Sequence, residues 1–194
     1  AEMVDSGISL HLVPERPTLG YKEFNLNQDN FILLGRTGKV QAKIDLVADD
    51  GTGLKIYSEH SDPTALQDLT VSLNRLNLAE VTSVLPYVPR MSGLLNGDYH
   101  VVQDAEGQFS MVSDMAVRQM TYEGSPVGNV STELVYLQKE DDAHAVEARL
   151  MKDDEEIGLL TGTYYNKGEG SIDARFLMER LPLSLANGFV PDQL

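Results

Sequence analysis

The chain has 194 residues, 42% of them hydrophobic, and a formal net charge of −15 from 30 acidic and 15 basic side chains. It is long enough for one large domain with a real core, and no apolar run approaches the roughly 20 residues that a transmembrane helix needs. The charge argues against nucleic acid as a partner, because phosphates would be repelled, and the absence of cysteine excludes disulfides and thiolate metal sites.

The first half of the chain contains two alternating segments. In 39–48, apolar residues from Val40 to Ala48 occupy every second position, and 69–73 alternates in the same way. A period of two predicts strands with one apolar face and one wet face. The polar segment 49–53 between them reads as a turn of hairpin length.

One short helix is predicted at 78–85. Leu78, Val81 and Leu85 are spaced i, i+3, i+7, and Pro86 stops the pattern. Proline geometry then predicts an extended segment over 87–89, which ends at Pro89.

The strand that follows this helix carries two glycines. Gly93 and Gly97 lie on the same predicted face as Leu95, Tyr99 and Val101. Glycines on that face indicate a bend or a close packing partner. The segment 76–97 is therefore predicted to be a unit boundary, where a helix lies over the sheet, prolines turn the chain and a strand restarts the sheet.

The second half repeats the strand pattern. The segments 107–117, 143–150 and 170–179 alternate between apolar and polar residues, and polar turns occupy 104–107, 139–142, 153–156 and 166–170. Antiparallel sheets have this pattern and buried parallel sheets do not. We predict an all-β fold, an elongated antiparallel meander of roughly ten to twelve strands of about 6–10 residues each.

The last residues partly repeat the unit boundary. Arg75–Leu78 is matched about 105 residues later by 180–183, and 85–89 finds a partial echo in 189–191. This pattern predicts a second boundary near 181–194. The chain begins and ends in mid-pattern, so residues 1–194 are expected to form one repeat-like β segment of a longer protein.

Three stretches carry a resemblance to a known family. They are LNLAEVTSVLPYVPRMSGLLNGDYHV (76–101), MTYEGSPVGNVSTELVY (120–136) and LPLSLANGFVPDQL (181–194). Together they resemble the translocation and assembly module TamB family of the AsmA-like group, over about residues 20 to 194. The shared positions are structural turn and bend residues, not chemical groups: Pro86, Pro89, Gly93, Gly97, Gly124 and Gly128.

The resemblance implies a long periplasmic protein of Gram-negative envelopes, tethered in the inner membrane by an N-terminal helix. Its body would be a β-sheet curled into a trough with an aliphatic concave face (a β-taco). The family is linked to phospholipid transport and to outer-membrane protein assembly. The anchor and the C-terminal region of the family are missing here, and any contact with an outer-membrane assembly barrel protein would run through those missing regions.

The aliphatic stripes are the only candidate site. The residues concerned are Val130, Leu134, Tyr136, Val146, Leu150, Ile172 and Phe176. From the residues alone a packed core is the commoner role of such a stripe. The resemblance implies that the same atoms line a groove for phospholipid acyl chains, and both interpretations stay open.

No catalytic, metal or cofactor site is predicted. The four histidines are far apart, and the acidic runs 140–142 and 153–156 lack the glycine and spaced oxygens of a calcium loop. The segment 124–128 has its serine misplaced for a nucleophile elbow and reads as a tight turn.

The prediction is a non-enzymatic segment. The alternative is a β-sandwich binding or adhesion module of the cell envelope, which is weaker because the chain has no Trp and only 7% aromatic residues. An enzyme would need a cluster of carboxylates in a cleft, which no spacing in the sequence indicates.

Overall fold

The computed structural model describes residues 2–13, 16–19, 22–58, 64–139, 143–165 and 170–179. Within them lie one helix and fifteen strands, with these bounds: β1 Glu2–Val4, β2 Gly7–Leu10, β3 Thr18–Leu19, β4 Lys22–Glu23, β5 Asn25–Leu26, β6 Phe31–Gly35, β7 Val40–Val47, β8 Gly53–Tyr57, β9 Gln67–Asn77, α1 Leu78–Val84, β10 Met91–Gln103, β11 Phe109–Tyr122, β12 Ser125–Gln138, β13 Ala143–Lys152, β14 Glu155–Tyr165 and β15 Ser171–Met178.

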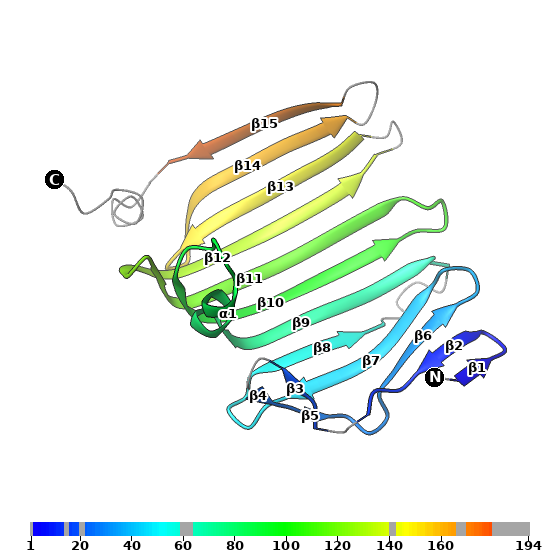
Figure 1. Cartoon of the computed structure of the whole chain (residues 1–194). Coiled ribbons are helices and arrows are strands. Elements are labelled where there is room, and N and C mark those ends of the chain that lie inside the picture. The colour runs from blue at the N-terminus through cyan, green and yellow to red at the C-terminus, as the bar shows by residue number, and fades with distance from the viewer. Residues whose placement is uncertain are drawn as a thin grey trace.

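Thirteen of the strands form a single open antiparallel sheet. Its order is β1-β2-β6-β7-β8-β9-β10-β11-β12-β13-β14-β15, and β5 pairs with β7 beyond the end of β6. From β6 onward every strand lies beside its neighbour in the sequence (Figure 1). The predicted all-β meander is therefore confirmed, although β9 to β12 and β14 are 11 to 14 residues long and exceed the predicted length.

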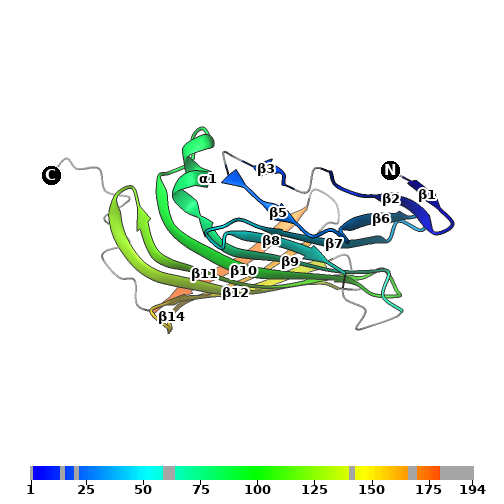
Figure 2. The ribbon, with the colours of Figure 1, turned by 90° about the horizontal axis from the view of Figure 1, so that it is seen from below.

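The sheet is strongly curved. Figure 2 shows the ends of β10 and β11 curling upward on the side of the sheet where α1, β3 and β5 lie. That side is the concave one. The open, curled form agrees with the trough that the resemblance implied.

The helix begins and ends through local contacts. The Asn77 side chain accepts a hydrogen bond from the backbone N–H of Ala79 at 3.0 Å, and its own amide donates to Glu80 at 3.1 Å. The first bond satisfies one free backbone N–H of the first turn, and the second holds the capping side chain in place. Leu85 is already extended, as expected for a residue before proline, so the prediction of a helix at 78–85 is confirmed to within one residue.

The segment after the helix differs from the prediction. Tyr87 has a φ of 64°, so 87–89 is not continuously extended. A single left-handed residue reverses the chain in a short turn, which brings it from α1 into β10.

Two of the hairpins have two-residue turns in which both turn residues have positive φ. Tyr122 pairs with Ser125, and both residues between them have positive φ. Lys152 and Glu155 enclose Asp153 and Asp154 in the same way. Mirror-image turns of this kind match the twist of the flanking strands. The predicted turns at 124–128 and 153–156 are thus tighter than expected, and Pro126, Gly128 and Glu155 already belong to strands.

The fully buried core is small and lies at the N-terminal end of the described chain. Phe24, Leu26, Ile44, Leu46 and Ala48 form it. The partly buried side chains of Ile32, Leu54 and Ile56 pack against it. The core forms where the strands β4 and β5 meet the concave side of β7 and β8, so it closes only one end of the trough.

Candidate functional site

Strand register places the seven predicted groove residues on one face of the sheet. Residues directly opposite each other in a ladder point to the same side. Tyr136 stands opposite Val146, and the same ladders connect the other members through the pairs Ser113–Leu134, Val117–Val130, Thr132–Leu150, Leu160–Phe176 and Tyr164–Ile172. The stripes that alternate along single strands therefore join into one surface.

We call this surface the trough face. It continues through the ladders to β7, where Ile44 lies opposite Ile56, and Ile56 opposite Val71 of β9. Between β7 and β15 its described members are Ala42, Ile44, Leu46, Leu54, Ile56, Leu69, Val71, Leu73, Leu95, Gly97, Tyr99, Val101, Phe109, Met111, Ser113, Met115, Val117, Val130, Thr132, Leu134, Tyr136, Gln138, His144, Val146, Ala148, Leu150, Lys152, Gly158, Leu160, Gly162, Tyr164, Ile172, Ala174, Phe176 and Met178. By the same pairing rule Gln67, Leu76, Gln103 and Glu155 also belong to this face, and its charged members are Lys152 and Glu155, which stand opposite each other at the end of the β13–β14 hairpin.

The opposite surface, the outer face, carries the charges. Its members include Lys43, Asp45, Lys55, Asp98, Asp114, Glu133, Glu147, Arg149, Asp173 and Arg175. A chain with a net charge of −15 thus has most of the charged groups of its strands on one side of the sheet, and the Lys152–Glu155 pair of the other side lies at a hairpin end. The trough face is therefore much less charged than the outer face.

Exposure along the trough face increases toward β15. Val130, Leu134, Tyr136, Val146 and Leu150 are half-buried. The last two groove residues are exposed, Ile172 by 75% and Phe176 by 53%. None of the seven is enclosed like the core at the other end, so their apolar atoms are accessible from the concave side.

Two predicted bend glycines lie where β11 approaches β10 closely. A Cβ on Gly97 would stand 3.0 Å from Cγ of Met115 and 3.2 Å from the carbonyl oxygen of Asp114. Gly93 has a φ of 128° and lies in a bulge, 2.9 Å from the carbonyl oxygen of Arg118 by the same measure. A larger residue at either site would push the two strands apart.

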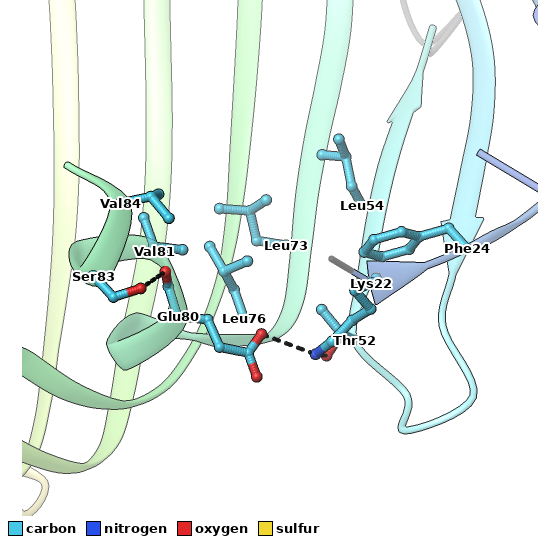
Figure 3. Close-up of a pocket in the computed structure, with 11 residues that line it drawn as sticks. Lys22, Phe24, Thr52, Leu54, Leu73, Leu76, Glu80, Val81, Ser83 and Val84 are labelled. Atoms are coloured by element: carbon cyan, nitrogen blue, oxygen red, sulfur yellow. Dashed lines mark hydrogen bonds and ion pairs between the residues drawn. The ribbon is translucent and has the colours of Figure 1, made fainter. Parts of the chain in front are cut away.

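A pocket lies between α1 and the sheet at the end of the trough near β8 and β9 (Figure 3). Its volume is about 540 Å³, and Phe24, Leu54, Leu73, Leu76, Val81 and Val84 supply its apolar lining. Leu54 and Leu73 stand opposite each other on the trough face. The pocket is therefore a covered part of that face.

Charged groups gather at the edge of this pocket. The Lys22 amine is 2.8 Å from Asp50 and 3.1 Å from Glu80, and the Lys22 side chain is 21% exposed. The hydrogen bond to Asp50 is the main cause that raises the pKa of Lys22, against a smaller opposing effect of burial. The same bond holds the pKa of Asp50 well below its usual range.

An aromatic cluster lies on the trough face near β13. The His144 ring stacks between Tyr136 and Tyr164, with ring centroids 5.9 and 5.8 Å away, and Phe109 meets Tyr136 edge to face. Nδ1 of His144 and the Tyr136 hydroxyl are 2.5 Å apart. The rings of Tyr136, His144 and Tyr164 line a shallow depression of about 450 Å³ together with Val146 and Ile172.

The sequence placed His144 in an alternating strand but did not reveal this cluster. The rings that contact each other are 8, 20 and 27 positions apart in the sequence, and only the register brings them together. The other histidines behave differently. His100 contacts the buried carboxylate of Asp68 at 2.8 Å, and His11 follows β2 without belonging to a strand.

Several predicted features lie outside the described residues. These are the repeat and boundary at 180–194, the acidic run 140–142, His60 and most of the turn 166–170. In the part of the chain that is described, no group of three or more His, Asp or Glu side chains could hold a metal ion. No helix of that part is long and apolar enough to cross a membrane.

Comparisons with known proteins add no relative. No family model, no curated protein and no solved structure matches the chain.

Proposed function

We propose that this chain is a non-enzymatic segment of a periplasmic, envelope-spanning protein, and that its trough face binds phospholipid acyl chains. The observation that carries this proposal is the trough face itself. Nine successive strands present a mainly apolar face to the concave side of an open sheet, with one charged pair, Lys152 and Glu155, at a hairpin end, while most charges of the strands lie on the outer face. Hydrocarbon chains are the chemistry that such a surface favours.

The setting of this function follows from the resemblance in the sequence. The segment would support phospholipid transport, outer-membrane protein assembly or both. The whole protein would be anchored in the inner membrane through regions outside this chain. Contact with an outer-membrane assembly barrel protein would also use those regions.

The β-sandwich alternative is wrong in its fold. A sandwich needs two sheets that cover each other's apolar faces, whereas the described strands form one open sheet and a two-stranded hairpin. The exposed Ile172 and Phe176 are what a second sheet would have covered.

The test is mass spectrometry of organic extracts of the purified chain, with native mass spectrometry of the same sample. We expect bound phospholipid in the wild type and its loss in Leu134→Asp and Phe176→Asp, because a buried charge is unfavourable beside hydrocarbon. Val135→Asp is the matched control, since Val135 neighbours Leu134 but is 39% exposed on the outer face. A folded wild type free of lipid, or equal loss in the control, would contradict the proposal.

A further inference from the structure

We infer that the pocket beneath α1 is a distinct site for one alkyl chain of an amphiphile, whose head group stays outside at the Lys22–Glu80 pair. This inference rests on the proposed function and adds to it a defined position, stoichiometry and head-group preference. The site would hold the end of a single chain, whereas the rest of the trough face is open.

The size and lining of the pocket fit a hydrocarbon chain. Ligand pockets usually measure about 300–1,000 Å³ and are mostly apolar with few polar groups, and this one measures about 540 Å³. The stick view shows Leu54, Leu73 and Phe24 facing Val81 and Val84 across the space (Figure 3). Apolar cavities of even about 150 Å³ stay dry and accept apolar ligands.

The charged groups are confined to one edge of the pocket, although the hydroxyl of Ser83 also lies on its helix side. Lys22 and Glu80 form an ion pair at that edge, on the side away from Val84 (Figure 3), and Asp50 also pairs with Lys22. An amphiphile has the same division into an apolar chain and a polar end. A chain inserted among the leucines and valines would leave its head group beside these three charges.

The charges at the edge favour one class of head group. One ammonium is shared by two carboxylates, Asp50 and Glu80, so the edge carries an excess negative charge. An anionic head group would meet that excess charge, whereas a zwitterionic head group can place its cationic part beside it. We therefore expect the site to prefer a zwitterionic amphiphile.

The helix covers the pocket without being deeply packed. No residue of α1 is fully buried, and Val84 is 61% exposed. The Thr82 hydroxyl lies within hydrogen-bond distance of two carbonyl oxygens, 2.9 Å from that of Leu78 in the helix and 3.2 Å from that of Met91 in β10. A cover of this kind can admit a chain through small movements of side chains.

The test is a titration of the chain, carrying labelled Leu and Val methyl groups, with dodecylphosphocholine below its micelle concentration. We expect saturable shifts of one-to-one stoichiometry at Leu73, Leu76 and Val81. Laurate, which has an anionic head group, should bind about fivefold more weakly.

Two variants fill the pocket and one serves as control. Val81→Phe and Val84→Phe add bulk from the helix and should weaken binding about tenfold or more. Val84→Phe covers the case in which Val81→Phe does not fold, because its side chain is mostly exposed. Val112→Phe is the control, since Val112 is 52% exposed and lies on the outer face, and binding should be unchanged.

The outcomes separate this inference from the proposed function. Shifts at Leu134 and Val146 alone would overturn the pocket site and leave lipid binding by the trough face intact. Shifts at the pocket that persist in both filled variants would also overturn it. Pocket binding that survives Leu134→Asp would support the site even if the extracts contain no phospholipid, and equal affinity for laurate would overturn the head-group preference.

Discussion

At the residue scale, Ser113 is the least expected member of the trough face. Its side chain is 3% exposed, and its hydroxyl has no hydrogen-bond partner among the described residues. Tyr99 and Leu134 stand directly opposite it on the neighbouring strands. Burial removes the hydrogen bonds of a hydroxyl to water, and without a partner in the protein this free-energy cost is not recovered.

Replacing this hydroxyl should stabilise the protein. We expect Ser113→Ala to raise the free energy of unfolding by about 1 kcal/mol, measured by urea denaturation. Ser131→Ala is the control, because Ser131 is half-buried on the outer face, and it should change stability by less than about 0.5 kcal/mol. Destabilisation by Ser113→Ala would show that the hydroxyl is paired in solution.

The space around Gly97 is too small for a larger side chain, so we predict that glycine is required at this position. Gly97→Val should lower the free energy of unfolding by about 1–3 kcal/mol, because its side chain would meet Met115 and the backbone of β11. Gly162→Val is the matched control on the same face, where the nearest atom to an added Cβ is 3.6 Å away. Valine is favoured in strands, so the control should be neutral or stabilising, and equal losses in both variants would refute the role of close packing.

At the element scale, the outer face contains a row of like charges. Asp98 of β10 stands opposite Asp114 of β11, and Asp114 opposite Glu133 of β12. All three side chains are exposed, and Asp98 also accepts a hydrogen bond from Ser72. Like charges directly opposite each other destabilise a strand pair.

Neutralising the middle carboxylate should therefore stabilise the sheet. We expect Asp114→Asn to raise the free energy of unfolding by about 0.2–1 kcal/mol at low ionic strength, with a smaller gain at high salt because exposed charges are screened. Asp173 lies opposite Thr163, so Asp173→Asn should give no gain. Denaturation of both variants at two salt concentrations tests this, and a gain that does not depend on salt would contradict the electrostatic cause.

The link between α1 and the N-terminal strands should depend on pH. Lys22 holds the pKa of Asp50 below its ordinary value of 3.8, so their interaction stabilises the fold above that pH and is lost as the pH falls through the lowered pKa. The pKa of Lys22 is raised above its ordinary value of 10.5, so at alkaline pH the interaction is lost only above that value. The interaction is therefore fully present between these limits.

Lys22→Met tests this link. The difference in melting temperature between wild type and Lys22→Met should stay constant from about pH 5 to 9 and shrink below about pH 4. Lys39→Met is the control, because the Lys39 amine donates to the carbonyl oxygen of Ala65, so its difference from wild type should not follow this acid profile. A difference for Lys22→Met that is the same at pH 3 and pH 7 would contradict the assignment.

The sequence predicted local features better than long-range ones. Alternation along single strands identified β7, β9, β11, β13 and β15, and spacing with a following proline identified α1, because both depend on neighbouring residues. The charged edge of the pocket is formed by Lys22, Asp50 and Glu80. Asp50 lies 28 positions after Lys22 in the sequence, and Glu80 lies 30 positions after Asp50. The left-handed Tyr87 and the stacked His144 likewise depend on how the chain packs, so propensity could not predict them.

At the scale of the whole molecule, the sheet is nearly one-dimensional. From β8 to β15 each strand pairs only with its neighbours in the sequence, and the buried cluster lies at one end, around Ile44 and Leu46. All but one of the eight residues of β15 are exposed. In such an array the free energy of unfolding is approximately the sum of the stabilities of the single strands and of the contacts between neighbouring strands. The end with the buried cluster should therefore be more stable than the end with the exposed strand β15.

Native-state hydrogen exchange should show this gradient. We expect the paired amides of β7 and β8 to exchange at least about tenfold more slowly than those of β14 and β15, because opening the C-terminal strands exposes little additional apolar surface. A bound amphiphile on the trough face should slow exchange mainly in β13 to β15, where Ile172 and Phe176 are otherwise exposed. Filling of the α1 pocket alone should instead slow exchange around β8 and β9. Uniform protection throughout the sheet would show that it unfolds as one cooperative unit, and the ends of the trough would then not be independent in stability.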